Sequence, residues 1–155
     1  MLFAAGCKVY SFTGASIPPD VKNFSVELFQ STANNGPASL PQTFTDRLKL
    51  KFQTEGNLRM VTRDGDLQFK GVITNYTYTN EAPVAGATSG LNKLTIGVQV
   101  EFVNTKNEKE NFTENFSRFA QFSSAENITQ VEDRLIEEIN RQLVDDVFQR
   151  ALVKW

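Results

Sequence analysis

The feature that most constrains this chain is a strict alternation of apolar and polar side chains near its middle. The apolar members are Leu94, Ile96, Val98, Val100 and Phe102. Because successive side chains of a β-strand point to opposite faces, the alternation predicts a half-buried strand. Such a strand needs neighbouring strands and a layer that covers its apolar face. The remaining sequence must therefore supply both.

Four other segments carry the same signal in weaker form. Strands are predicted over residues 21–29, 58–62, 66–79 and 112–122. Within the longest of these, the apolar phase changes side near Gly71, which we interpret as a β-bulge. The change would put Tyr76 and Tyr78, together with Phe119 of the later strand, on the sheet face away from the helices. Exposed aromatic side chains there would indicate an interface.

Two segments have helical periodicity. The first begins at Ser39, where Gln42 three residues later predicts a capping box, and it ends near Gly56. The second covers most of residues 124–153, with Ser123 and Glu126 as its predicted capping box. Apolar residues line one face of each helix, which is typical of helices packed on a sheet. We expect the aromatic end of the second helix, with Phe148 and Trp155, to protrude from the domain.

The order of these segments predicts an α+β fold. The sequence runs β-α-β-β-β-β-α, which indicates a small mixed sheet of four to five strands with both helices packed on one face. The first strand–helix–strand passage favours a parallel crossover, and the later strands favour antiparallel hairpins. A chain of 155 residues suffices for one domain with a core. We expect that domain over 21–155, preceded by an extended lead-in over 7–20.

The composition argues against catalysis. The chain has no histidine and one cysteine, which removes the commonest general base, the commonest metal ligand and Cys-based zinc sites. Asp64 and Asp66 could form an acid/base or metal pair, but Asp64-Gly65-Asp66 is also typical of a turn, which we favour. With a net charge of −2, the chain has no global attraction to nucleic acid, so a polyanion could bind only at a local basic patch. We expect no enzyme activity, cofactor or metal.

The N-terminal heptapeptide Met1-Leu2-Phe3-Ala4-Ala5-Gly6-Cys7 is typical of the end of a lipoprotein signal peptide. We interpret residues 1–6 as a signal-peptide remnant and Cys7 as the site of lipid attachment, including palmitate, because two or more acyl chains give a stable membrane anchor. Ala4 stands where Leu or Val is usual. The alternative is a cysteine with no such role near a frayed terminus.

Several basic residues could meet the phosphates of an anionic glycolipid. They are Arg47, Lys49, Lys51, Arg59, Arg63, Lys70 and Lys93. Each could equally belong to an ordinary solvated surface. From these we select Lys93, Arg59 and Lys70 as candidate lipopolysaccharide contacts.

The motifs in combination resemble the lipopolysaccharide-assembly lipoprotein family, LptE. They are Gly6-Cys7, Tyr10-Ser11-Phe12-Thr13-Gly14, Ser16-Ile17-Pro18-Pro19, Val21-Lys22-Asn23-Phe24-Ser25-Val26, Asp64-Gly65-Asp66-Leu67-Gln68-Phe69, Leu91-Asn92-Lys93-Leu94-Thr95-Ile96 and Phe116-Ser117-Arg118-Phe119. A terminal helix rich in Glu and Asp follows them, so the resemblance covers nearly the whole chain from Cys7 to Trp155.

The resemblance implies a non-catalytic outer-membrane lipoprotein that faces the periplasm. Such a protein plugs the β-barrel translocon LptD, assists its assembly and helps deliver lipopolysaccharide to the outer leaflet. The implied partners are an LptD-like barrel, lipopolysaccharide and the membrane that holds the N-terminal lipid. Lysine at position 8 is consistent with outer-membrane sorting. The alternative is a periplasmic lipoprotein that serves as a binding module of another cell-envelope complex.

Overall fold

Three long antiparallel strands form the centre of the domain. In the computed structural model, which describes residues 16–87 and 89–153, they are β4 (Leu67–Glu81), β5 (Leu91–Asn104) and β6 (Phe112–Ser123). β5 contains the alternating segment of the sequence and pairs with β4 on one edge and β6 on the other. The strand predicted most strongly by the sequence is therefore the middle of this antiparallel ladder.

Short parallel strands complete the sheet. The strand order is β3-β1-β4-β5-β6, where β1 is Asn23–Val26 and β3 is Arg59–Met60; β2 (Gln30–Ser31) also pairs with β4. The first strand–helix–strand passage joins β1 to β3, which are parallel, as predicted. The later strands are antiparallel, as predicted.

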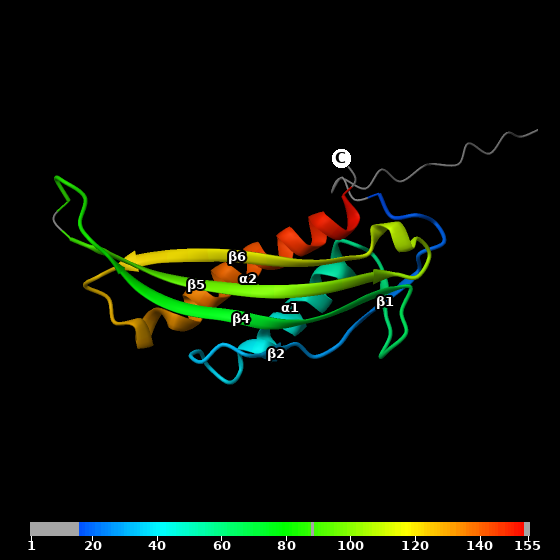
Figure 1. Cartoon of the computed structure of the whole chain (residues 1–155), viewed down its shortest axis with the longest axis horizontal. Coiled ribbons are helices and arrows are strands. Elements are labelled where there is room, and N and C mark those ends of the chain that lie inside the picture. Colours follow the sequence, from blue (N-terminus) through cyan, green and yellow to red (C-terminus); the bar gives the residue numbers. More distant parts are fainter. Residues whose placement is uncertain (1–15, 88, 154–155) are drawn as a thin grey trace, which may run out of the picture.

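Two helices cover one face of this sheet and leave the other open (Figure 1). They are α1 (Leu40–Thr54) and α2 (Ile128–Leu152), and a short 3-10 turn, η1 (Glu108–Glu110), lies between β5 and β6. The predicted α+β class and the placement of both helices on one face are confirmed. The sheet has six strands instead of the expected four to five, because the two-residue strand β2 forms just beyond the first predicted strand.

The core lies between the sheet and the helices and is rich in phenylalanine. Phe52 of α1 is fully buried and contacts three other rings, with centroid distances of 4.5 Å to Phe69, 5.1 Å to Phe148 and 5.6 Å to Phe24. One side chain thus joins both helices to two strands. The expectation that Phe148 protrudes is wrong, because its ring is buried in this cluster. Trp155 lies outside the described residues.

The strand predicted over 21–29 breaks after Val26. Phe29 turns into the core, where its ring contacts Phe44 with 4.9 Å between centroids, and its N–H donates to Thr45 Oγ1 at 3.0 Å. Leu28 alternates in phase with the buried Phe24 and Val26, yet it is 52% exposed. The break follows from these contacts with α1. Gly71 of β4 leaves room for the Phe29 ring, because an added Cβ there would approach the ring to 2.6 Å.

The β-bulge lies three residues beyond the predicted position. Gly71 pairs regularly with Val100, and the register shifts between Ile73 and Asn75. The extra residue at this shift moves the following alternation by one, so Tyr76 and Tyr78 return to the helix side. The prediction that these tyrosines lie on the open face is therefore wrong.

Neither predicted capping box caps its helix. Ser39 precedes α1 but makes no side-chain cap bond, and Gln42 instead donates to Asp46 at 2.8 Å. Ser123 and Glu126 do interact, since Glu126 accepts the N–H of Ser123 at 3.0 Å. That contact stabilises a turn before α2, whose N-cap is Asn127, accepting the N–H of Thr129.

Candidate functional site

The uncovered face of the sheet is the most distinctive surface of the described protein. Directly paired residues on neighbouring strands point to the same side, so the pairings assign each residue to a face. The centre of the open face is uncharged across β4, β5 and β6, and we name this area the open strip. Its residues are Val72, Asn75, Thr77, Thr79, Thr95, Gly97, Gln99, Asn115, Ser117 and Phe119.

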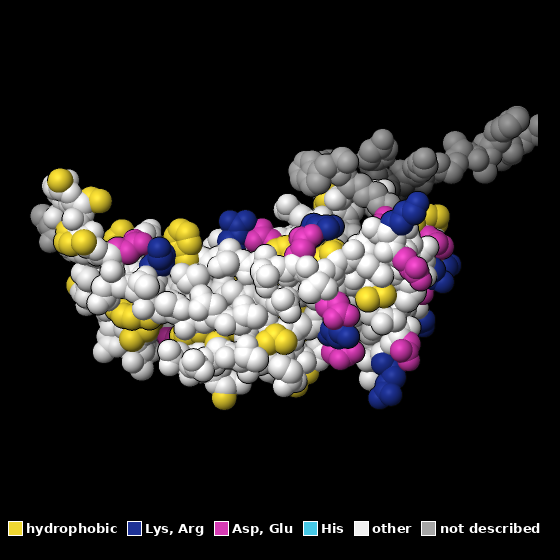
Figure 2. Space-filling model, viewed as in Figure 1, with side chains coloured by type: hydrophobic (Ala, Val, Ile, Leu, Met, Phe, Trp, Pro, Cys, Tyr) yellow, Lys and Arg dark blue, Asp and Glu magenta, His cyan; other side chains and the backbone are white. Residues whose placement is uncertain are grey.

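Small hydrogen-bonding side chains dominate the open strip. Thr77 Oγ1, for example, donates to Asn75 Oδ1 within the strip. Gly97 contributes no side chain at all, which keeps the middle of the surface low. Figure 2 views this side and shows a broad central area without Lys, Arg, Asp or Glu, while charged side chains gather at one end and along the margins. The strip offers hydrogen bonds without net charge.

A compact polar cluster closes one end of the strip. Lys93 Nζ lies 2.8 Å from Glu81 Oε1 and 5.1 Å from the ring centroid of Phe119, which is 52% exposed. Gln121 Nε2 donates to the other oxygen of Glu81 at 2.7 Å. The hydrogen bonds from Lys93 and Gln121 hold the pKa of Glu81 below its ordinary value. As predicted, Phe119 faces away from the helices, and here it forms part of a cation–π contact.

The other candidate glycolipid contacts lie elsewhere. Lys70 is at the opposite end of the strip, 3.1 Å from Glu101. Residues 93 and 101 of β5, beside these two lysines, are eight residues apart and therefore about 27 Å apart along the strand. Arg59 lies on β3, the edge strand beyond β1. The structure therefore does not bring Lys93, Lys70 and Arg59 into one site.

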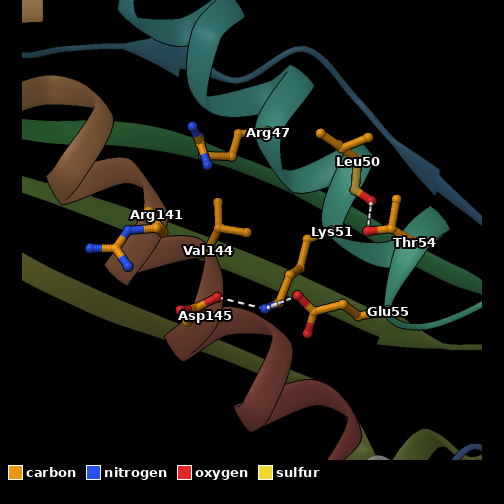
Figure 3. Close-up of a pocket in the computed structure, with 8 residues that line it drawn as sticks. All are labelled: Arg47, Leu50, Lys51, Thr54, Glu55, Arg141, Val144 and Asp145. Atoms are coloured by element: carbon orange, nitrogen blue, oxygen red, sulfur yellow. Dashed lines mark hydrogen bonds and ion pairs between the residues drawn. The ribbon is translucent and has the colours of Figure 1, made fainter. Parts of the chain in front are cut away.

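A groove between the helices is the second candidate surface (Figure 3). The cavity measures about 250 Å³ and lies between α1 and α2. Lys51 Nζ crosses it, 2.7 Å from both Asp145 Oδ1 and Glu55 Oε1. Burial alone would lower the pKa of Lys51, but the hydrogen bonds to Asp145 and Glu55 outweigh it and raise the pKa above 10.5.

Most of the charges of this groove are paired within the protein itself. Arg47, on its wall, pairs with Glu137 at 2.8 Å and so joins α1 to α2, as Lys51 does. A lysine held by two carboxylates is protonated and is a poor general base. The groove is a structural junction between the helices.

The acidic turn has a structural role too. Asp66 Oδ2 accepts the backbone N–H groups of Lys22 at 2.9 Å and Asn23 at 3.3 Å. Mainly through the Lys22 bond, its pKa lies below its ordinary value of 3.8. Asp64 has a positive φ of 56°. Gly65 packs so closely on β1 that an added Cβ would lie 2.5 Å from Ser25 N. These contacts support the turn interpretation.

The remaining expectations concern the lipid anchor, metal binding and membrane spans. Cys7 and the segment 1–6 lie outside the described residues. Within the described part of the chain, no three Asp, Glu or Cys side chains come together as a metal site. In that same part, neither helix has the combination of length and apolarity that crossing a membrane requires.

A comparison with protein families then identifies the chain. A model of the LptE family, described as lipopolysaccharide-assembly, matches residues 21–151. The chain belongs to the LptE family. No curated protein matches the sequence. The resemblance inferred from the motifs is confirmed, and the match covers most of this LptE-family domain.

Solved structures with the same fold come from several bacteria. A minor lipoprotein from Acinetobacter baumannii has a TM-score of 0.52 and 12% identity over 84% of this chain and 92% of that one. The hypothetical protein CT253 from Chlamydia trachomatis has a TM-score of 0.55 and 10% identity over 84% and 98%. Protein XCC0632 from Xanthomonas campestris has a TM-score of 0.56 and 11% identity over 86% and 85%. At these identities the likeness concerns the fold.

The open strip could not be predicted as a unit from the sequence. Its signal was present as Thr, Asn, Gln and Ser at outward positions of three separate segments. Those segments could be joined only once the strand register and the bulge position were known.

Proposed function

We propose that this LptE-family chain is a non-catalytic, periplasm-facing outer-membrane lipoprotein. It plugs and assists assembly of an LptD-like β-barrel translocon and helps deliver lipopolysaccharide to the outer leaflet. The observation that carries the proposal is the family match over residues 21–151. The ion-paired groove and the structural role of Asp66 support a non-catalytic function, because they leave these charged groups committed to the fold.

The proposal includes a lipid anchor on Cys7. The first described residue, Ser16, donates its N–H to Leu152 O at the end of α2. The β4–β5 hairpin lies at the opposite end of the domain (Figure 1). A tether ahead of Ser16 would therefore hold the membrane-proximal end beside the C-terminus of α2.

The two ends of the domain lie far enough apart for lipopolysaccharide delivery across a membrane. β5 alone, with 14 residues, spans about 44 Å, whereas the hydrocarbon core of a bilayer is about 30 Å thick. A domain anchored in the inner leaflet and standing inside a barrel could place its hairpin end near the outer leaflet. Lys93, beside Phe119, is then the foremost proposed lipopolysaccharide contact. Lys70 and Arg59 would contact lipopolysaccharide elsewhere along its path.

Co-purification tests the partner. A tagged full-length chain, expressed in its own envelope, should retain a large outer-membrane barrel after detergent extraction. Retention of a different envelope complex, without any barrel, would reject the proposal and favour the role of a binding module in another complex.

Substitution of Cys7 tests the anchor. In cells that lack the barrel partner, Cys7→Ser should move the chain from the membrane fraction to the soluble periplasm. Leaving the barrel out prevents it from retaining the unlipidated protein. Membrane fractionation unchanged from the wild type would contradict lipid attachment at Cys7.

A further inference from the structure

The two edges of the sheet are very different in length. The sheet ends at β3, which has two residues, and at β6, which has 12 residues and lies along one margin of the domain (Figure 1). Alternate residues of an edge strand direct their N–H and C=O groups away from the sheet. Among the described residues, no backbone hydrogen bond joins residues 113–122 to any element besides β5. β6 therefore presents a row of unpaired backbone groups that is roughly 40 Å long.

β6 also lacks the sequence devices that commonly keep an exposed edge from pairing. Natural proteins interrupt such edges with proline or a β-bulge, or place lysine on them. From Phe112 to Ser123, β6 has no proline, glycine or lysine, and its pairing with β5 continues without a register shift. A long and regular edge is a template for another strand. The chemistry of this edge thus specifies its partner as an extended strand.

The only charged residues of β6 are Glu114 and Arg118, and both pair with α2. Glu114 Oε1 lies 2.6 Å from Arg150 Nη2, and Arg118 Nε lies 2.7 Å from Asp146 Oδ2. The side chains of Glu114 and Arg118 still remain 40% and 48% exposed. Since they are four positions apart, both lie on the helix side of the strand. Their opposite signs determine how β6 can pair with a copy of itself.

A two-fold axis perpendicular to the sheet pairs two copies of β6 in antiparallel order. With the axis at Phe116, Glu114 of each copy lies opposite Arg118 of the other copy. The charges then alternate in sign across the contact, from Arg150 through Glu114 to Arg118 and Asp146 of the second copy. An axis at position 114 or 118 would bring like charges together, and an axis at 115 or 117 would leave both charges opposite uncharged residues. The charge pattern selects Phe116 as the centre.

The other pairs of this register are also compatible. On the helix side, the half-buried Phe116, which packs against the core, meets its own copy. On the open side, Asn115 lies opposite Ser117, so neutral hydrogen-bonding side chains meet there. The residues from Phe112 to Ala120 of each copy enter the ladder, which would contain about eight to ten hydrogen bonds. Opposite charges and aromatic side chains are both favourable cross-strand pairs.

We propose that β6 is a dimerisation edge, at which two copies of this chain form one continuous antiparallel sheet with the two-fold axis at Phe116. The occupant is a second copy because the complementary charges lie on the same strand. The inference goes beyond the proposed function and does not depend on it, since it concerns the chain when no barrel partner is bound.

Charge reversal tests this pairing. The full chain is studied in its unlipidated Cys7→Ser form, so that neither acyl chains nor a disulfide bond can join two copies. Glu114→Arg places arginine opposite arginine across the axis, and Arg118→Glu places glutamate opposite glutamate. When the two variants are mixed in equal amounts, arginine meets glutamate at both sites. Sedimentation equilibrium from about 1 to 500 μM measures the Kd of the dimer, and circular dichroism verifies the fold of each variant.

The unsubstituted strand should give a dimer within this concentration range. Each variant alone should dimerise at least about tenfold more weakly, and the mixture should recover to within about threefold of the unsubstituted strand. Matched controls are Glu137→Arg and Arg141→Glu, which make the same charge changes, four residues apart, at exposed positions on the side of α2 toward α1. The controls should stay within about twofold, both alone and mixed.

Three results would overturn the proposal. The first is a chain that remains monomeric at about 500 μM, where even a weak specific contact is populated. The second is a dimer that the β6 variants do not weaken, or that the α2 controls weaken as much. The third is weakening by both β6 variants without recovery in the mixture, which would exclude the register centred on Phe116.

Barrel retention is measured separately, with the same substitutions in the lipidated full chain. A monomeric chain that retains a barrel would overturn the pairing and leave the plug function standing. A dimer that retains no barrel would have the reverse meaning. If the chain is monomeric and Glu114→Arg abolishes barrel retention, the edge accepts a strand of that partner, which also overturns pairing between copies.

Discussion

The open strip and the helix layer are both polar surfaces of one small domain, but they are polar in different ways. The helix layer presents long charged side chains that pair across α1, α2 and β6. The strip presents short neutral side chains on three strands. Hydropathy alone does not distinguish the two surfaces, since Thr or Glu at an outward position satisfies the same alternation. The two surfaces differ in the kind of partner surface that could cover them.

The exposed surfaces and the core differ in how much they contribute to the stability of the fold. Ion pairs between exposed side chains contribute about 0–1 kcal/mol each, so the charges of the helix layer add little to the fold. The apolar contact beneath them contributes far more. Changes at the junction of the layers should therefore affect the whole molecule, and changes at either exposed surface should affect stability much less.

The largest effect is expected from Phe52→Ala. This substitution empties the position that joins both helices to the sheet, so it should reduce the free energy of unfolding by about 3–5 kcal/mol. Urea denaturation of the purified domain measures the change. Gln53→Ala, its exposed neighbour on α1, should change stability by less than about 0.5 kcal/mol. A similar small loss at both positions would show that the aromatic cluster does not hold the layers together.

Two glycines on opposite faces sharpen the comparison. At Gly71, on the helix side, an added Cβ would lie 2.1 Å from Gln99 O and 2.6 Å from the Phe29 ring. At Gly97, on the strip, the nearest atom would be Asn75 Cβ at 3.2 Å. We expect Gly71→Ala to cost about 2 kcal/mol and Gly97→Ala less than about 1 kcal/mol. Equal thermal shifts for the two variants would contradict the assignment of faces.

A smaller effect with a defined pH dependence is expected at Asp66. Its folded-state pKa is lowered, so its carboxylate stabilises the fold above its ordinary pKa of 3.8, and that contribution disappears as the pH falls through the lowered value. Asp66→Asn should cost about 1 kcal/mol near pH 7, since part of the hydrogen bonding survives. Denaturation at several pH values should show the two proteins converging below pH 3.8. A constant difference down to the acid limit would exclude this origin.

The smallest effect is expected from the ion pairs of the helix layer. Arg118 Nε and Nη2 both donate to the carboxylate of Asp146, each at 2.7 Å. Because the arginine is exposed, a double-mutant cycle with Arg118→Ala and Asp146→Ala should give a coupling energy of about 0.5 kcal/mol. Added salt should reduce it further. A coupling energy above about 2 kcal/mol would mean that the charged surface of the helix layer does contribute to stability.

Much of the architecture could be predicted because it depends on local periodicity. The alternation around Val98 and the apolar stripes of the helices indicate the two layers without knowledge of their neighbours. The errors occurred where a non-local contact overrides the local signal. Phe29 leaves its strand because it packs on Phe44, and the bulge occurs beside Ile73 instead of at Gly71 because pairing with β5 determines the register.

The candidate site was less predictable than the fold. Lys93, Lys70 and Arg59 were selected as basic residues able to meet phosphate, and nothing in their spacing shows that they lie far apart. Phe119 was correctly assigned to the open face, because no bulge intervenes in β6. Tyr76 and Tyr78 were assigned to the wrong face, because a single extra residue in a strand moves every following side chain to the opposite face of the sheet.

By itself, the sequence determined that the chain forms a sheet covered by two helices, that it lacks histidine, and that its motifs are those of LptE. Each of these depends on residue identity or on short-range spacing. Only the tertiary structure decided that neutral residues from β4, β5 and β6 meet in one strip, with charged residues at its ends and on the helix side. The physical reason is that strand register and the bulge set the face of each residue, and both arise from pairing between distant segments.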